Sequence, residues 1–233
     1  MHERPVDQLR PVSVELGFTE STPGSVLISM GRTRVLCTAS IEDDVPRWMR
    51  DGDRGWVTAE YGMLPGSSNE RIRRDHVSGG RAMEISRLIG RGLRAAVNLK
   101  AMGQVMARVD CDVIEADGGT RTAAITGAWI ALHQTLEDAV VRDVLAGNPI
   151  IDQVAAVSVG IVDGAKVLDL DYASDVNAEV DLNVVMSGRG LLIEVQGTAE
   201  GAPFTRDDLN DLLDLATSGL SELHDMQRRA VAD

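Results

Sequence analysis

Residues 115–129 read EADGGTRTAAITGAW and lie where two periodicities meet. The preceding run VDCDVI, residues 109–114, alternates apolar and polar residues, which is the pattern of a half-buried strand. The apolar residues of the following run recur at helical spacing: Ile125, Ala128, Trp129, Leu132, Leu136 and Ala139. The two glycines therefore mark the point at which a strand ends and a helix begins.

A glycine pair followed by an arginine at the start of a helix suits an anion. The backbone N–H groups of a first helical turn lack intrahelical partners and carry partial positive charge. Gly118 and Gly119 let the backbone approach a ligand closely, and Arg121 adds a forked donor. An ordinary glycine turn with a threonine cap explains the same residues, so the junction alone leaves both interpretations open.

Turn residues divide the remainder of the chain into further expected elements. Strands are expected at residues 13–18, 25–30, 34–41, 56–61 and 179–184. Two hairpins are expected to turn at 163–164 and 187–190, and a closing helix begins at a capping box of Thr205 and Asp208. No linker, low-complexity run or repeat separates the halves, so the sequence predicts one α+β domain over residues 1–233.

The net charge of −13 conceals one basic segment. The segment from Arg71 to Arg94 contains seven arginines and only two acidic residues, Asp75 and Glu84. Its charge is therefore +5, and the remainder of the chain carries −18. A basic patch on an acidic body is compatible with a polyanion bound at one place. A solvated charged face explains the same run of charges.

Composition also bears on location and on the kind of nucleic-acid contact. Aromatic residues are only 3% of the chain, which argues against an aromatic platform as the main way of holding bases. The longest apolar run, residues 154–162, is much shorter than the roughly 20 residues of a membrane helix, and the first twelve residues lack the apolar core of a signal peptide. Cys37 and Cys111 are expected to be free thiols. We therefore expect a cytoplasmic protein that contacts no membrane.

One arginine of the basic segment lies within the apolar stripe of its helix. The stripe consists of Ile85, Leu88, Ile89, Leu93 and Ala96. At about 100° per residue, Arg81 falls about 40° from Ile85, whereas Arg87, Arg91 and Arg94 fall on the opposite face. A cation is unfavourable in the first turn of a helix, so Arg81 requires an anion nearby. A structural carboxylate and a bound phosphate both meet this requirement.

The stretch DVNAEVDLN, residues 175–183, contains three carboxylates. In a strand, Glu179, Asp181 and Asn183 share one face, and Asp175 is expected to project from the preceding loop. Carboxylate oxygens suit Mg²⁺ or Mn²⁺, which proteins hold through one or two carboxylates together with substrate phosphates. An exposed polar strand face is the alternative. The sequence contains no GxxxxGK[ST] loop, no GxSxG elbow and no HExxH motif.

Taken together, these segments resemble ribonuclease PH, a phosphorolytic exoribonuclease family that trims tRNA precursors. The resemblance runs nearly from end to end. It is carried by RPVDQLRPV, GSVLISMG, VLCTAS, VPRWMR, GWVTAEYGMLP, EISRLIGRGLRA, DCDVIEADGGTRTAAITGAW, AAVSVGIVDG, AEVDLNVVM and EVQGTAEGAPFTRDDL. It implies an α+β fold of mixed sheets with a left-handed βαβ crossover, assembled as a hexameric ring, a trimer of dimers.

The resemblance also implies roles for particular residues. Inorganic phosphate, the co-substrate, would be bound by Arg81, Gly119, Thr120 and Arg121. Asp175 and Asp181 would be the catalytic residues and would hold Mg²⁺, with Mn²⁺ as an alternative, although Asp181 could instead be a general acid. The arginine-rich loop, with Arg71, Arg73 and Arg74, would contact tRNA precursors and other RNA 3′ ends.

The sequence departs from the family pattern at several positions. The loop before Arg81 is about three residues shorter and lacks the usual lysines, which puts its contact with tRNA in doubt. Ala82 replaces a threonine, and Glu115 replaces a glutamine beside the phosphate-binding residues. A catalytically weak ring subunit of the exosome type, which binds RNA or partners, is therefore the alternative interpretation.

Overall fold

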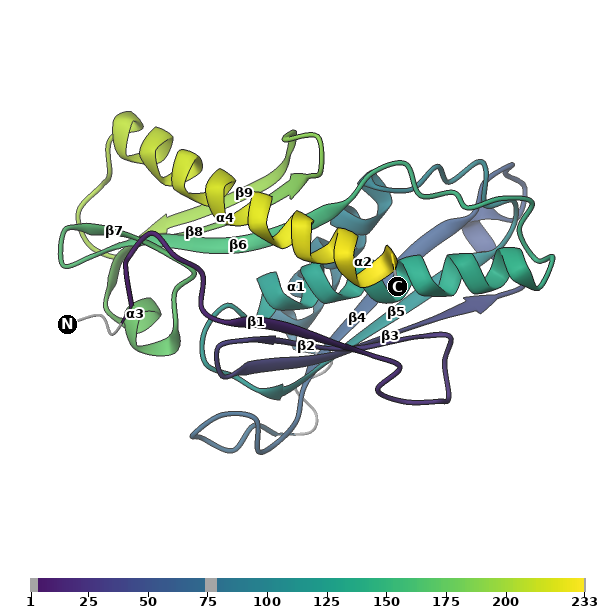
Figure 1. Ribbon diagram of the computed structural model, residues 1–233, viewed down its shortest axis with the longest axis horizontal. Coiled ribbons are helices and arrows are strands. Elements are labelled where there is room, and N and C mark those ends of the chain that lie inside the picture. Colours follow the sequence, from purple (N-terminus) through teal and green to yellow (C-terminus); the bar gives the residue numbers. More distant parts are fainter. Residues whose placement is uncertain (1–3, 74–78, 233) are drawn as a thin grey trace.

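The alternating apolar residues of the N-terminal half form a five-stranded sheet. A computed structural model describes residues 4–73 and 79–232 (Figure 1). The sheet has the order β1-β2-β3-β5-β4. Its strands are β1 Val12–Leu16, β2 Gly24–Met30, β3 Thr33–Glu42, β4 Trp56–Met63 and β5 Met106–Glu115. Only β4 and β5 run parallel, and all other neighbours are antiparallel, so the sheet is mixed.

The second sheet is entirely antiparallel, with the order β7-β6-β8-β9. Its strands are β6 Val154–Val162, β7 Ala165–Leu168, β8 Ala178–Ser187 and β9 Leu192–Ala199. Asp163 and Gly164 both have positive φ, at 50° and 73°, which matches the two-residue hairpin turn expected there. The β8–β9 hairpin places Asp181 opposite Thr198 and Asn183 opposite Gln196, and this register brings polar side chains of both strands together.

The helices are α1 Gly80–Ala95, α2 Thr120–Val141, α3 Tyr172–Val176 and α4 Arg206–Ala232, with a short 3-10 turn η1 at Arg47–Met49. The expected apolar stripe of α1 is fully buried. The capping box of α4 is present, because the Asp208 N–H donates to Thr205 Oγ1 at 3.1 Å and the Thr205 N–H donates to Asp208 Oδ2 at 3.1 Å. The helices and hairpins that the sequence predicts are therefore confirmed.

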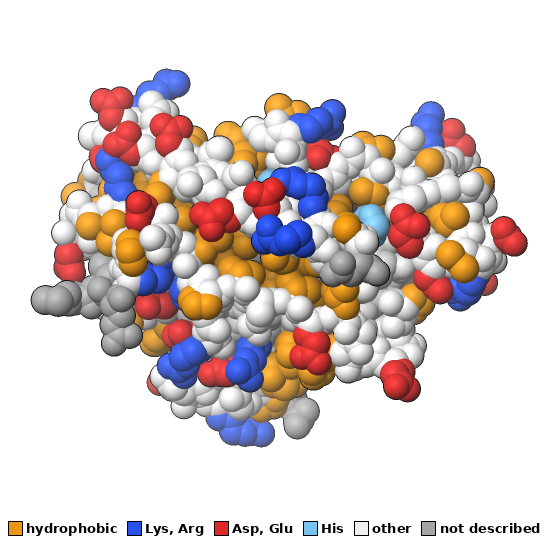
Figure 2. Space-filling view, viewed as in Figure 1, with side chains coloured by type: hydrophobic (Ala, Val, Ile, Leu, Met, Phe, Trp, Pro, Cys, Tyr) orange, Lys and Arg blue, Asp and Glu red, His pale blue; other side chains and the backbone are white. Residues whose placement is uncertain are grey.

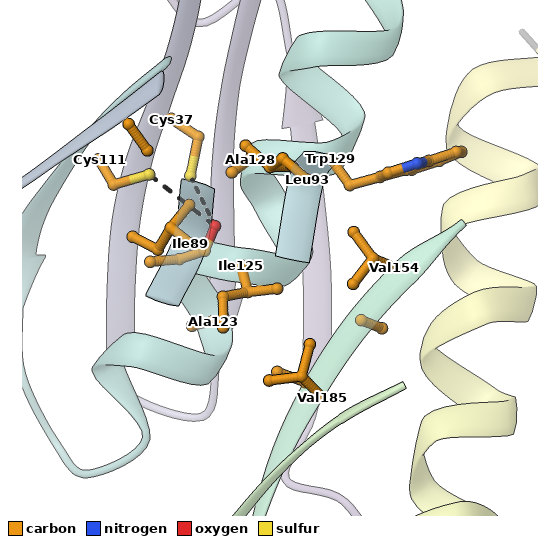
Figure 3. Close-up of a cluster of buried hydrophobic side chains, with 14 of the residues drawn as sticks. Cys37, Ile89, Leu93, Cys111, Ala123, Ile125, Ala128, Trp129, Val154 and Val185 are labelled. Carbon is orange, nitrogen blue, oxygen red and sulfur yellow. Dashed lines mark hydrogen bonds between the residues drawn. The ribbon is translucent and has the colours of Figure 1, made fainter. Parts of the chain in front are cut away.

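Helix α2 is buried on all sides over its first three turns, although its sequence predicted a single apolar stripe. Residues between the stripe positions, among them Ala123, Ala124, Ile130 and Ala131, are also buried. The reason is visible in Figure 3, where α2 lies between Cys37 and Cys111 of the first sheet and Val154 and Val185 of the second. A helix covered on both faces by sheets has no polar side. The two sheets consequently share one hydrophobic core.

Asp175 is placed differently from the sequence prediction. It was expected to project from a loop, but it lies within the short helix α3. Asp171 stabilises the start of this helix, since its Oδ1 accepts a hydrogen bond from the Ser174 N–H at 2.8 Å. Asp175 therefore projects from a capped helical turn.

Two features expected from the sequence stay predictions. The parallel strands β4 and β5 are joined through α1, which is the βαβ unit that the family resemblance implies. The handedness of this connection stays a prediction. So does the single-domain boundary at residues 1–233.

The surface gives two further observations. On the face shown in Figure 2, basic and acidic side chains are interspersed, so this face presents no single basic surface to a polyanion. Among the described residues, no helix combines the length and the apolarity that a membrane crossing requires.

Candidate active site

A pocket of about 670 Å³ lies where the N-terminal ends of α1 and α2 meet the second sheet. Its lining brings together all six residues that were predicted to bind phosphate or to be catalytic: Arg81, Gly119, Thr120, Arg121, Asp175 and Asp181. These residues come from segments far apart in the chain. The other lining residues are Met63, Ser68, Ala116, Gly118, Ser158, Tyr172, Val176, Asn183, Gln196, Thr198 and Glu200.

The glycine pair forms a turn that requires glycine. Gly118 and Gly119 have φ values of 77° and 64°, in the left-handed region. A Cβ on Gly118 would lie 2.6 Å from the Leu170 carbonyl oxygen, so no other residue fits without a shift of the backbone. Gly119 is the N-cap of α2, and no side chain caps the helix. The threonine cap that the sequence left open is therefore not formed among the described residues, and the first residues of α2, Thr120 and Arg121, line the pocket.

Thr120, the first residue of α2, is fixed from the first sheet. The buried Tyr61 hydroxyl of β4 donates to Thr120 Oγ1 at 2.8 Å. Burial raises the pKa of Tyr61, and its hydrogen bond to Thr120 opposes this shift. Tyr61 is therefore a neutral donor at physiological pH, and it holds Thr120 at the edge of the pocket.

A buried ion pair holds the glycine turn from the other side. The Arg10 guanidinium contacts Asp169 through Nη2–Oδ1 at 2.7 Å and Nε–Oδ2 at 2.9 Å, and Asp169 is completely buried. The same guanidinium donates to the Asp117 carbonyl oxygen at 2.6 Å and to the Gly118 carbonyl oxygen at 3.4 Å. The N-terminal segment therefore fixes the backbone that leads into α2.

The two arginines of the pocket have different surroundings. Arg81 is exposed and makes no hydrogen bond or ion pair with any residue that the structure describes, so its guanidinium is available to bind an anion. Burial raises the pKa of Asp175, and the positive charge of Arg81 opposes this rise. Arg121 is mostly buried, and its Nη1 donates to Gln196 Oε1 at 3.1 Å and lies 3.9 Å from Glu84 Oε1.

Gln196 connects Arg121 to a charged network between α1 and β9. Its Nε2 donates to Glu84 Oε1 at 3.2 Å and to Glu194 Oε1 at 2.9 Å. Glu194 in turn accepts two hydrogen bonds from Arg91, at 2.8 and 2.7 Å. The amide oxygen of Gln196 accepts from Arg121, and its amide nitrogen donates to Glu84 and Glu194. Gln196 is therefore held in one orientation, which in turn orients the Arg121 guanidinium.

The two aspartates share a partly buried corner of the pocket. Burial raises the pKa of Asp181 to about 6, with a further contribution from the negative charge of Asp175, while Arg121 opposes the shift. Burial also raises the pKa of Asp175, and Arg81 and Arg121 oppose it. Asp181 Oδ1 is buried and has no hydrogen-bond partner among the described residues. Asp181 Oδ1 is therefore available to a ligand in the pocket.

This donor set fits one small divalent cation. Two neighbouring carboxylates, one with an unpartnered buried oxygen, provide the one or two protein ligands through which Mg²⁺ is usually bound. In the described part of the chain there is no cluster of three or more His, Cys, Asp or Glu side chains that could hold a metal. The remaining ligands would therefore come from water and substrate phosphate.

The arginine loop begins at the pocket. Ser68 lines the pocket, and the Ala116 N–H donates to the Ser67 carbonyl oxygen at 2.7 Å, which attaches the loop to the residue beside the glycine turn. Arg71 and Arg73, further along the loop, are exposed. Arg74 lies outside the residues that the structure describes.

Two departures from the family pattern lie away from the pocket lining. Ala82 is buried in the hydrophobic core. Glu115 points toward Arg32 and Arg34, at 3.4 and 3.9 Å. Neither side chain lines the pocket, so the carboxylate of Glu115 adds no charge to its lining.

Comparison with known proteins decides the family. The two models of the 3′ exoribonuclease family match this chain in order, domain 1 at residues 8–136 and domain 2 at residues 152–219. The chain belongs to the 3′ exoribonuclease family. Within this family it is similar to ribonuclease PH of Methylobacterium radiotolerans, with 54% identity over 99% of this chain and 98% of the relative. Ribonuclease PH of Brucella ovis is 52% identical, with the same coverage.

Two solved structures share the fold of this chain. An Archaeoglobus fulgidus exosome chain, from a complex with RNA bound to the active site, matches with a TM-score of 0.81 and 22% identity over 96% of this chain and 90% of that chain. A chain of an archaeal exosome core matches with a TM-score of 0.76 and 20% identity over 97% of this chain and 89% of that chain. At this level of identity the likeness concerns the fold alone.

The resemblance to ribonuclease PH that the sequence motifs indicated is therefore confirmed. Because the ribonuclease PH relatives are 52–54% identical to this chain over nearly its whole length, the chain is a phosphorolytic 3′→5′ exoribonuclease. In the reverse direction this enzyme is a nucleotidyltransferase. The exosome-type alternative has less support.

Several pocket residues were missed from the sequence. Gln196 and Thr198 lie at a spacing of two along β9, and Glu200 continues this spacing directly after the strand. This polar alternation, beside the acidic strand β8, was the signal that could have identified them. Arg10 and Asp169, 159 residues apart, left no such signal.

Proposed function

We propose that the pocket between α1, α2 and the second sheet carries out phosphorolysis of RNA 3′ ends, including those of tRNA precursors. The observation that carries the proposal is the convergence of Arg81, Arg121, Asp175 and Asp181 in one cavity. Inorganic phosphate is the co-substrate, bound by the two arginines together with the backbone of Gly119 and Thr120. The glycine turn permits this close approach of backbone and phosphate.

The chemistry requires two anions to approach each other. A phosphate oxygen attacks the phosphorus of the last phosphodiester, the bond from that phosphorus to the 3′ oxygen of the preceding nucleotide breaks, and a nucleoside diphosphate leaves. Arg81 and Arg121 neutralise and orient the attacking phosphate, which lowers the cost of bringing both reactants together. One phosphoanhydride bond forms for each phosphodiester bond that breaks, and this exchange is close to balanced in free energy, so the reaction runs in both directions.

Asp175 and Asp181 are assigned to the opposite side of the reacting phosphorus. Mg²⁺ or Mn²⁺ bound by these two side chains would supply positive charge to the phosphoryl group and to the departing 3′ oxygen. The unpartnered Oδ1 of Asp181 supports this assignment. A second role is supported by the raised pKa of Asp181, about 6, which also suits a general acid that protonates the 3′ oxygen.

The remaining assignments extend from the pocket outward. Arg71, Arg73 and Arg74 are assigned to the body of the RNA, because their loop starts at the pocket. The fold shared with exosome chains supports a ring-shaped homo-oligomer, and we favour a hexamer, a trimer of dimers. The free, buried thiols of Cys37 and Cys111 support a location in the cytoplasm.

The phosphate assignment predicts the effect of changing Arg121. Replacing it by methionine removes charged hydrogen bonds to phosphate, so we expect the KM for phosphate to rise by about 10- to 150-fold. Arg87→Met is the matched control: it makes the same change at an exposed arginine of the neighbouring helix α1, and Arg87 does not line the pocket. The measurement is the initial rate of nucleoside diphosphate release as a function of phosphate concentration. An Arg121→Met enzyme with a KM for phosphate within twofold of the wild-type value would remove Arg121 from the phosphate site.

A further inference from the structure

One aromatic side chain of the pocket has no part in the reaction described above. Tyr172 is 55% exposed although it lines the pocket, and no described residue hydrogen bonds to its hydroxyl. Among the residues that the structure describes, it is the only aromatic side chain in the pocket lining. A large amphipathic ring left open at a ligand pocket is available to contact a ligand.

The backbone of Tyr172 is fixed against the proposed phosphate site. A Cβ on Gly118 would lie 2.7 Å from the Tyr172 backbone nitrogen, so the glycine turn and the first residue of α3 are in close contact. The capping hydrogen bond from the Ser174 N–H to Asp171 fixes the turn in which Tyr172 begins the helix. The ring is therefore attached to two rigid segments, and it requires little ordering when a ligand arrives.

Helix geometry places the Tyr172 ring on the face of α3 that carries Asp175. Asp175 and Val176 are three and four residues after Tyr172, so the three side chains lie on one face of the helical turn. All three line the pocket. A group in contact with Tyr172 and Val176 therefore lies next to Asp175, on the side where the scissile bond is assigned.

We propose that Tyr172, with Val176 beside it, is the platform on which a nucleobase stacks, and that this base belongs to one of the two nucleotides flanking the scissile bond. This inference rests on the function proposed above. The ligand class is a planar nucleobase rather than a phosphate, because the platform is an uncharged ring with an aliphatic neighbour. Stacking on an aromatic ring accepts every base, which suits an enzyme that removes nucleotides in succession. The low aromatic content of the sequence concealed this platform, because a single ring is sufficient for one base.

The test is a comparison of three substrates and four proteins. The substrates are a short RNA oligonucleotide and the same oligonucleotide with an abasic ribose at either of its last two positions. The proteins are the wild type, Tyr172→Ala, Tyr172→Phe and Phe18→Ala, the last an exposed aromatic residue that does not line the pocket. Both kcat/KM for the RNA and its equilibrium binding without phosphate are measured, together with the KM for phosphate.

We expect Tyr172→Ala to lower kcat/KM and affinity for the intact RNA by about 5- to 150-fold, with an unchanged KM for phosphate. Tyr172→Phe should restore most of this loss because the ring is retained, and Phe18→Ala should behave as the wild type. On one of the abasic RNAs, Tyr172→Ala should cause no further loss, and that RNA identifies the stacked base.

An equal loss from Tyr172→Ala on the intact RNA and on both abasic RNAs, or no loss on the intact RNA, would overturn the platform. Failure of the proposed function gives a different result. If no protein releases nucleoside diphosphates but the binding data retain the dependence on ring and base, the assignment of the reaction fails and the platform stands.

Discussion

The Asp181→Asn variant is expected to lose phosphorolysis by at least about 10²-fold in kcat, because either role assigned to Asp181 requires a carboxyl group at this position. An amide can neither carry the negative charge that holds a cation nor donate the proton that a general acid supplies. The loss is measured as nucleoside diphosphate release at saturating RNA and phosphate. The KM for phosphate should change little, since the arginines remain.

The same variant should be no less stable than the wild type. The pKa of Asp181 is raised to about 6, so the folded protein binds this proton more tightly than the unfolded chain does. Stability therefore falls as the pH rises from the unfolded pKa through about 6, and at neutral pH the ionised carboxylate destabilises the fold. Asparagine removes this charge, and Tm measured at pH 7.5 should stay equal or rise.

A matched control separates activity from stability. Burial also raises the pKa of Asp110, which lies on β5 outside the pocket lining. Asp110→Asn should therefore retain activity. Near-normal turnover of Asp181→Asn, or equal loss of activity in both variants, would contradict the role given to Asp181.

The largest expected loss of stability follows from Asp169→Ala. Asp169 is completely buried and accepts hydrogen bonds from the Arg10 backbone N–H and from its guanidinium. Removal of one partner leaves the buried Arg10 charge uncompensated, which costs about 3–5 kcal/mol in the free energy of unfolding. For a chain of this size, that corresponds to a fall in Tm of roughly 6–20 °C.

Backbone strain requires a separate control. Asp169 has a φ of 54°, so alanine is unfavourable there for a local reason as well. Asp143 has a φ of 57°, is exposed and has no such buried partner, so Asp143→Ala measures the local effect alone. Thermal unfolding of both variants is the measurement. If Asp169→Ala unfolds no earlier than Asp143→Ala, the buried pair does not stabilise the turn.

Much of the fold could be predicted from the sequence because its signals are local. The alternation of β2 and β3, the stripe of α1 and the capping box at Thr205 each lie within a few consecutive residues. The glycine–arginine junction is also contiguous, so the strand, the turn and the helix start of α2 could be identified together. Its complete burial could not, since that depends on the second sheet.

The candidate site divides in the same way. Family resemblance identified the arginines and aspartates that converge in the pocket, whereas local patterns left each of them with a plain structural alternative. The Arg10–Asp169 pair joins residues 159 apart, and nothing near either residue indicates the other. Gln196 and Tyr172 matter through the residues that they face, which only the packing of β9 and α3 determines.

The central claim is that phosphate, rather than water, cleaves the RNA in this pocket. The most direct measurement is an analysis of the products after mixing the protein with a 3′-extended tRNA and Mg²⁺, with and without inorganic phosphate. We predict that nucleoside diphosphates appear, and only in the sample with phosphate. Nucleoside monophosphates in both samples would contradict the claim, because they would mean hydrolysis and would leave Arg81 and Arg121 without an attacking phosphate to bind.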